Sequence, residues 1–253
     1  MLPIIVSEIG SAGPAWGRRG EKVSSIIARE IVRDIAQRKL APGDMLESES
    51  VMLQRYQVAR ASLREALRIL EVHGLIRMKP GPGGGPVVSE VDSAEFGRMA
   101  TLFFQVQGIQ FSELVEARLI LEPLIARLAA QRHDPGDNDE LRQIVQQGFA
   151  AKTDAEWLAA SNAFHAKVLS MAGNGLLSIF SRAMKDIFTE RASSVYVPRR
   201  RDKVRQVHAD IADAIIEGKA EVAEQLMREH MSDYAKATAK REPHLMNEVV
   251  DWR

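Results

Sequence analysis

The sequence has no cysteine, few aromatic residues, no long apolar run and no net charge. Without cysteine, disulfides, thiolate metal sites and cysteine nucleophiles are excluded, and a reducing compartment such as the cytoplasm is expected. Aromatic residues make up only 6 % of the chain, so aliphatic side chains and alanine supply most of its 45 % hydrophobic content. This composition is typical of a globular protein and favours helices packed on helices.

The N-terminal residues carry no targeting or membrane signal. The apolar run at residues 2–6 is too short for the core of a signal peptide or for a membrane helix, and no basic residue precedes it. Residues 1–20 are interpreted as a flexible leader with Gly, Pro and Ser, and no membrane partner is expected.

The zero net charge argues at first against a nucleic-acid binder, but the charges are unevenly distributed. Segment 55–79 contains six basic residues and only two acidic ones, Glu65 and Glu71. The basic residues are Arg55, Arg60, Arg64, Arg68, Arg77 and Lys79. A local basic segment on a neutral protein points to phosphate groups.

A proline- and glycine-rich stretch at residues 79–86 is the main break in the first part of the chain. It cannot continue a helix, and the apolar pieces at 75–78 and 87–88 predict two short strands joined by a glycine-rich tip. Three helices are predicted before it, at about 21–39, 48–56 and 59–73, with Ser48 as an N-cap and Gly74 closing the third. This order predicts a winged helix-turn-helix domain at residues 21–90.

The rest of the chain is predicted to be helical, so the fold class is mainly α. Helices are expected at about 93–107, 111–132, 138–151, 154–172, 175–192, 201–217 and 219–240. They predict a single all-α antiparallel bundle at residues 91–240 for effector binding and dimerisation, followed by a C-terminal tail at residues 241–253.

Three arginines recur at every fourth residue of the third predicted helix, opposite its leucines: Arg60, Arg64 and Arg68. A recognition helix needs this arrangement, because basic side chains reach guanine edges and phosphates in the major groove. A solvated amphipathic helix is the alternative interpretation, but the neighbouring wing favours DNA binding.

The same region closely resembles the N-terminal domain of the GntR family over roughly 70 residues. The matching stretches are Ala-Pro-Gly-Asp-Met-Leu-Glu-Ser-Glu at 41–49, Tyr-Gln-Val-Ala-Arg-Ala-Ser-Leu-Arg-Glu-Ala-Leu-Arg-Ile-Leu-Glu at 56–71 and Gly-Leu-Ile at 74–76. The resemblance implies that Arg60 and Arg64 read bases and that the wing tip near residues 83–85 enters the minor groove. The full set of DNA-binding candidates is Glu49, Ser50, Arg60, Ser62, Arg64, Arg68, Gly83 and Gly84.

Two positions depart from the family pattern and bear on the operator sequence. Ser50 stands where members of the fatty-acid-responsive branch often have arginine. Ala59 stands where a serine is usual before the first recognition arginine, so a hydroxyl that could cap the helix or touch phosphate is missing.

Three histidines lie beside apolar positions of predicted amphipathic helices: His165, His208 and His230. Three imidazoles that point into one bundle core could bind one divalent metal ion, zinc or a similar metal. A core histidine that is only hydrogen-bonded to a neighbour is the commoner arrangement.

The second domain resembles the FCD domain, the helical effector module of the FadR branch of GntR regulators. The matching stretches are Glu-Ala-Arg-Leu-Ile-Leu-Glu-Pro at 116–123, Ala-Phe-His at 163–165, Ala-Gly-Asn at 172–174, Val-His-Ala-Asp-Ile-Ala-Asp-Ala-Ile at 207–215 and Met-Arg-Glu-His-Met at 227–231. The resemblance implies a bundle that holds a divalent metal, an organic acid or both. Metal-binding members usually have an aspartate four residues before the first histidine, where this chain has Ser161. The alternative is that the histidines donate hydrogen bonds directly to the effector.

The effector-binding candidates are Arg118, Asn162 and Asn174. Arg118 on an apolar helix either pairs with Glu122 one turn later or, as the resemblance implies, holds an effector carboxylate. Asn174 is expected chiefly to cap the helix that begins at Gly175.

Taken together, these features predict a homodimeric, ligand-responsive repressor that binds double-stranded operator DNA and an organic-acid effector, with no catalytic residues. Two alternatives remain: a metal-dependent hydrolase that uses the three histidines and has the winged domain as an interaction module, and an effector-independent architectural DNA binder. No His-Glu-x-x-His or Gly-x-Ser-x-Gly motif supports the hydrolase.

Overall fold

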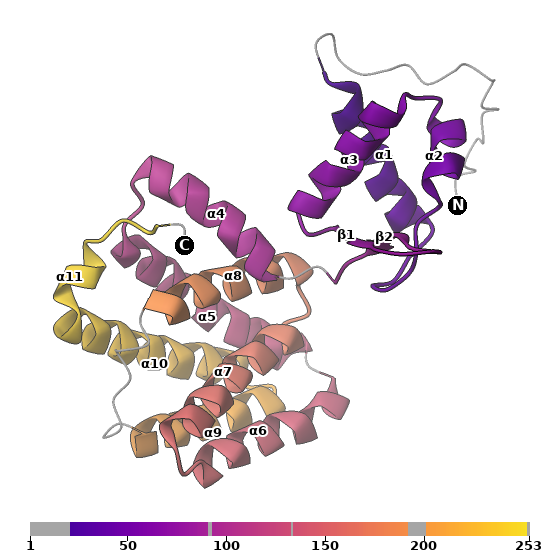
Figure 1. Ribbon diagram of the computed structural model, residues 1–253. Coiled ribbons are helices and arrows are strands. Elements are labelled where there is room, and N and C mark those ends of the chain that lie inside the picture. Colours follow the sequence, from indigo (N-terminus) through magenta and orange to yellow (C-terminus); the bar gives the residue numbers. More distant parts are fainter. Residues whose placement is uncertain (1–20, 91–92, 133, 192–200, 252–253) are drawn as a thin grey trace, which may run out of the picture. The chain divides into compact units, whose positions relative to one another are not determined.

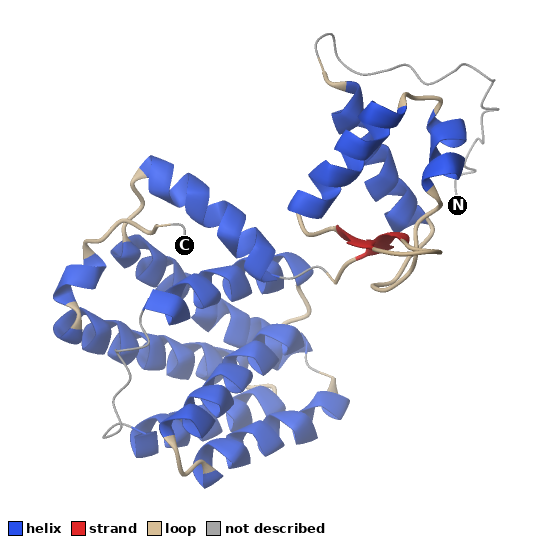
Figure 2. Cartoon of the chain, viewed as in Figure 1, coloured by secondary structure: helices blue, strands red, loops and turns tan. Residues whose placement is uncertain are grey.

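The computed structural model describes the whole chain except residues 1–20, 91–92, 133, 192–200 and 252–253 (Figure 1). The chain divides into two compact units, residues 1–92 and 93–253. Helices make up most of the described residues in each unit, and the described residues form one two-stranded sheet (Figure 2). The predicted mainly helical fold is confirmed, whereas the predicted leader lies outside the described residues.

The first unit contains three helices and a β-hairpin. In chain order the elements are α1 (Val23–Gln37), α2 (Glu49–Tyr56), α3 (Arg60–Val72), β1 (Ile76–Lys79) and β2 (Gly85–Val88). Helices α1 and α3 pack on each other, and their apolar faces bury Ile27, Ile31, Leu63 and Leu70. This is the predicted order of a helix-turn-helix followed by a wing.

Local hydrogen bonds explain where the helices of this unit begin. Ser48 is the N-cap of α2, because its side chain accepts a hydrogen bond from the backbone N–H of Val51 at 3.4 Å. Ala59 is the N-cap of α3 and has no side-chain acceptor to offer, as the sequence predicts. The Tyr56 hydroxyl also donates to Asp34 at 2.8 Å, which ties α2 to α1.

The wing is an antiparallel hairpin in which Ile76 pairs with Val88 and Lys79 with Gly85. Its tip requires glycine for two different reasons. Gly83 has a φ of +74°, a conformation that side chains rarely adopt. At Gly84 an added Cβ would lie 2.2 Å from the carbonyl oxygen of Lys79, so no larger residue fits without moving the backbone.

The second unit is an antiparallel helical bundle. Its elements are α4 (Ser93–Gln107), α5 (Phe111–Arg132), the short 3-10 helix η1 (Pro135–Asp137), α6 (Asn138–Ala150), α7 (Asp154–Met171), α8 (Gly175–Arg191), α9 (Arg201–Ile216), α10 (Ala220–Arg241) and α11 (Pro243–Met246). Helix α5 packs along α10 and also contacts α7, α8 and α9, so it lies at the centre of the bundle (Figure 1). No helix in the described part of the chain has the length and apolarity needed to cross a membrane.

The residues after α10 pack against the bundle, although the sequence suggests a tail from residue 241. Leu245 and Val250 are buried in a cluster that includes Phe111 at the start of α5. Two backbone hydrogen bonds, each of 2.9 Å, join this segment to the α4–α5 connection: Phe111 N–H to Glu248 O and Val250 N–H to Ile109 O. Such pairing between distant backbone groups leaves no periodic signal in the sequence.

The substitution Ala59→Ser should stabilise the start of α3. A serine hydroxyl at this N-cap can accept a hydrogen bond from a free N–H of the first turn, which is worth about 1 kcal/mol. Hydrogen exchange of the α3 amides, followed by mass spectrometry, should slow accordingly. Ala61→Ser, which places the hydroxyl inside the helix, is the matched control, and equal slowing in both variants would contradict the capping argument.

Candidate functional site

Helix α3 has two distinct faces. Leu63, Leu67 and Leu70 are buried in the core of the first unit, whereas the side chains of Arg60, Arg64 and Arg68 are exposed. The structure therefore places the three arginines together on the solvent side of one helix, as their spacing predicts.

Glu49 on α2 accepts a hydrogen bond from Arg64 Nε at 3.1 Å. The Arg64 side chain remains 69 % exposed, so this ion pair orients the guanidinium without covering it. An ionised carboxylate is repelled by DNA phosphates, and Glu49 is thus better placed to position Arg64 than to contact DNA itself.

The other DNA-binding candidates also lie at the surface or close to it. Ser50 is exposed, and its hydroxyl is 3.0 Å from that of Ser48 at the N-terminus of α2. Ser62 is half-buried on α3, Gly83 is exposed and Gly84 is half-buried at the wing tip.

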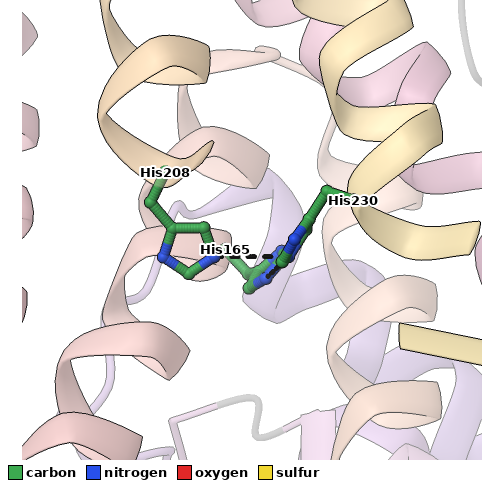
Figure 3. A group of neighbouring side chains, drawn as sticks. All are labelled: His165, His208 and His230. Atoms are coloured by element: carbon green, nitrogen blue, oxygen red, sulfur yellow. Dashed lines mark hydrogen bonds between the residues drawn. The ribbon is translucent and has the colours of Figure 1, made fainter. Parts of the chain in front are cut away.

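The three predicted histidines come together from three helices: His165 from α7, His208 from α9 and His230 from α10 (Figure 3). His230 Nε2 lies 3.3 Å from His208 Nε2 and 3.4 Å from His165 Nε2. The His208 ring stacks on Phe164 at a centroid distance of 4.1 Å, which fixes its orientation. The Nε2 atoms of the three histidines therefore face one another.

This arrangement fits the requirements of a divalent metal ion. One possible ligand atom from each histidine lies within 4.8 Å of the others. Nitrogens at about 2.05 Å from a tetrahedral zinc are separated by about 3.3 Å, close to the two distances from His230 Nε2 to the other rings. Burial and the neighbouring imidazoles lower the pKa of His230 to about 3 and that of His208 well below its usual value, so both rings are neutral, as metal ligands must be.

Glu122 on α5 supplies a carboxylate beside the cluster. Its Oε2 lies 2.9 Å from His165 Nδ1, and its Oε1 accepts hydrogen bonds from Arg118 Nε at 3.0 Å and Nη2 at 2.6 Å. Burial opposes ionisation of Glu122, but the charges and hydrogen bonds of His165 and Arg118 outweigh it and hold the pKa of this carboxyl far below its usual value.

Because an ionised carboxylate can only accept, Nδ1 of His165 must be the donor. This leaves Nε2, which faces the other histidines, as the atom of His165 that would bind a metal. Carboxylate–histidine pairs of this kind are typical supports of metal ligands.

Arg118 is only 8 % exposed and is engaged inside the bundle. Besides Glu122, its guanidinium faces the ring of Tyr234 on α10 at 5.7 Å from the centroid. The Glu122 pairing that the sequence suggests is therefore present, but it is buried rather than at the surface.

A pocket of about 200 Å³ opens beside the cluster. It is lined by Ser93, Glu122, Ile125, His165, Ala166, Leu169, Ser181, Arg182, Lys185 and Asp186. The asparagine candidates are not among these residues. Asn174 Oδ1 accepts a hydrogen bond from the Leu177 N–H at 3.1 Å and so caps α8, while the backbone oxygen of Asn162 accepts from Lys185 Nζ at 3.0 Å.

Three residues of this site were not among the sequence candidates: Glu122 as a histidine partner, and Ser181 and Lys185 as pocket residues. Glu122 carried a signal, since it lies one turn after a buried arginine. Ser181 and Lys185 share one face of α8, but nothing in the sequence shows which helix that face meets. Ser161 stands where metal-binding members of the family usually have aspartate, and Glu122 provides the only carboxylate hydrogen-bonded to His165 in the described part of the chain.

Two family models match the chain. The one described as "Bacterial regulatory proteins, gntR family" matches residues 24–84, and the one described as "FCD domain" matches residues 113–233. The solved structure of a GntR protein from Streptococcus agalactiae has a TM-score of 0.64 at 23 % identity, covering 84 % of this chain and 99 % of that one, so the two share a fold.

Curated relatives give the same result. The HTH-type transcriptional regulator LutR of Bacillus subtilis is 26 % identical over 77 % of this chain and 91 % of its own length. An uncharacterized HTH-type transcriptional regulator of Mycobacterium tuberculosis is 32 % identical over 70 % of this chain and 72 % of its own length. The chain therefore belongs to the GntR family of bacterial regulatory proteins, in the FadR subfamily with a C-terminal FCD effector domain, and is a DNA-binding transcriptional regulator rather than an enzyme.

Proposed function

We propose that this regulator is a homodimeric repressor whose operator binding changes when a divalent metal ion and a small organic acid bind in the C-terminal bundle. The observation that carries the proposal is the convergence of His165, His208 and His230 beside a pocket of about 200 Å³. A protein that acts on the bacterial chromosome works in the cytoplasm, where we place it.

The DNA half of the proposal rests on α3 and the wing. An arginine guanidinium can donate two hydrogen bonds to O6 and N7 of guanine, and Arg60 and Arg64 are exposed for this role. Arg68 is suited to phosphates, and the wing tip at Gly83 and Gly84 is narrow enough for the minor groove; there the backbone N–H of Gly83 is the donor, because that of Gly84 already donates to the Gly81 carbonyl oxygen at 2.9 Å. A dimer bound across two half-sites would exclude RNA polymerase from an overlapping promoter, which is the basis for proposing repression.

The effector half rests on the histidine site and the pocket that shares His165 with it. His165, His208 and His230 would hold the metal, and a bound divalent ion attracts carboxylate oxygens. A small acid suits the pocket, because drug-sized ligands need about 300–1,000 Å³. If no metal is bound, the same three imidazoles would hydrogen-bond the acid directly.

A stripe of exposed apolar residues on α4 supports the dimer: Phe96, Met99, Phe103 and Val106. Their spacing of three and four residues places them on one side of the helix, and Phe103 and Val106 are 66 % and 85 % exposed. The other side of α4 is occupied, since Gly97 and Thr101 are buried and Gly97 faces Ala183 of α8. Covering such a stripe with a second copy would remove it from water.

Arg64→Ala should weaken specific DNA binding by about tenfold to a hundredfold per half-site, because each lost arginine–guanine pair costs about 1–3 kcal/mol. The operator would first be selected from random DNA by the wild-type protein and then used in footprinting and in transcription assays. Arg142→Ala, an exposed arginine of α6, is the control. An unchanged footprint with Arg64→Ala would rule out the role assigned to Arg64.

Protein purified without chelators should contain one divalent metal ion per chain by elemental analysis and native mass spectrometry. His208→Ala should lose this ion, whereas His244→Ala, an exposed histidine of α11, should keep it. Metal should also dissociate as the pH falls, because protons compete for the imidazole nitrogens. A metal-free wild-type protein that carries a small acid would instead support direct contact between the histidines and the effector.

Val106→Asp should convert the dimer to a monomer, because a carboxylate in an apolar interface is costly to desolvate. Light scattering coupled to size exclusion measures the mass. Val222→Asp introduces the same charge at another exposed valine, on α10, and should leave the dimer intact. A dimer that survives Val106→Asp would place the subunit contact elsewhere.

A further inference from the structure

The wall of the pocket that α8 provides consists of polar residues: Ser181, Arg182, Lys185 and Asp186. Ser181 and Lys185 are one helical turn apart and therefore lie on the same face of α8. His165 and Glu122 come from α7 and α5 and line the same pocket. A ligand beside the histidines can thus meet a second group of polar side chains on α8.

Lys185 is a half-buried cation without a matching carboxylate. Its Nζ donates to the backbone oxygen of Asn162 at 3.0 Å, and no carboxylate of the described residues lies within 4.0 Å of it. Burial lowers the pKa of Lys185, which shows that its charge is poorly compensated. Lys167 on α7 is the contrast: it is buried more deeply than Lys185, but Asp137 and Glu140 both accept hydrogen bonds from it.

The hydroxyl oxygen of Ser181 is buried and has no hydrogen-bond partner among the residues that the structure describes. Buried hydroxyl groups without a partner are uncommon in native proteins, because leaving one unpaired costs free energy. Since an ammonium group has three N–H donors, Lys185 and Ser181 together offer unused hydrogen-bond donors on the pocket wall.

The charges around the pocket add up to an excess of positive charge. Arg118, Arg182 and Lys185 are cationic, and Glu122 and Asp186 are anionic, which leaves three minus two, or +1. A divalent metal on neutral histidines would raise this to +3. A single carboxylate leaves most of that charge unmatched, whereas two carboxylates leave +1.

We propose that Ser181 and Lys185, flanked by Arg182, form a second anion subsite, so that the effector is a small dicarboxylate. One carboxylate faces the histidine cluster and the other is bound by the α8 wall. This assignment rests on the proposed function in that the first carboxylate binds at the histidines. The assignment goes beyond the proposed function because it specifies a second carboxylate on the effector and the residues that select this carboxylate.

The test compares pairs of acids that differ only in the distal carboxylate: propionate and succinate, butyrate and glutarate, and L-lactate and L-malate. Binding to the purified full-length protein is measured by calorimetry and by the shift in Tm. In at least one pair the dicarboxylate should bind at least about tenfold more tightly than the matching monocarboxylate. A hydrogen bond between charged groups contributes enough binding free energy for a change of this size.

Lys185→Met should remove this preference while changing monocarboxylate binding less than about twofold. Ser181→Ala should weaken dicarboxylate binding by a smaller factor than Lys185→Met does. Lys219→Met, at an exposed lysine outside the pocket, should keep the full preference. The ligand-free Lys185→Met protein should unfold at the wild-type temperature or above it, because an uncompensated buried charge is removed.

The subsite is wrong if no dicarboxylate binds more tightly than its partner, or if the preference persists in Lys185→Met. A different result would contradict the proposed function and leave the subsite intact. Dicarboxylates would then bind with the expected dependence on Lys185, but saturating dicarboxylate would leave operator affinity unchanged in the footprinting assay.

Discussion

The effector domain is organised around one buried carboxylate. Glu122 lies on the central helix α5, accepts two hydrogen bonds from Arg118 and contacts His165 of α7, while Arg118 also faces Tyr234 of α10. Removing Arg118 would leave the Glu122 carboxylate inside the bundle without its cation, which costs several kcal/mol. The orientation of the His165 ring depends on this carboxylate, and the convergence of the three histidines depends in turn on that ring.

The polar groups of the bundle are satisfied to very different degrees. Lys167 has two carboxylate partners, and Asn174 caps α8, so these groups stabilise the fold. Lys185 and the Ser181 hydroxyl lack comparable partners, and both line the pocket. Groups that the fold leaves unsatisfied are suited to a ligand, because binding then provides hydrogen bonds that the free protein does not make.

The winged unit is instead determined largely by local chemistry. The alternation of leucine and arginine on α3 orients the helix, and glycine at the wing tip is dictated by backbone geometry, most strictly at Gly84. One long-range feature is added by the fold, namely the pairing of Arg64 with Glu49 of α2. A DNA-binding regulator needs this combination, since DNA contacts depend on side chains that are held in place yet remain exposed.

The sequence by itself determined the helices, the hairpin, the two faces of α3 and the identity of the three histidines, because helical and strand periodicity and turn residues act over a few neighbouring positions. Only the tertiary structure decided that the Arg118–Glu122 pair is buried and that Glu122 meets His165, since a pair one turn apart has the same spacing at the surface and in a core. It also decided that Ser181 and Lys185 line the pocket and that Val250 packs near Phe111. These features join residues far apart in the chain, and local sequence patterns carry no information about such contacts.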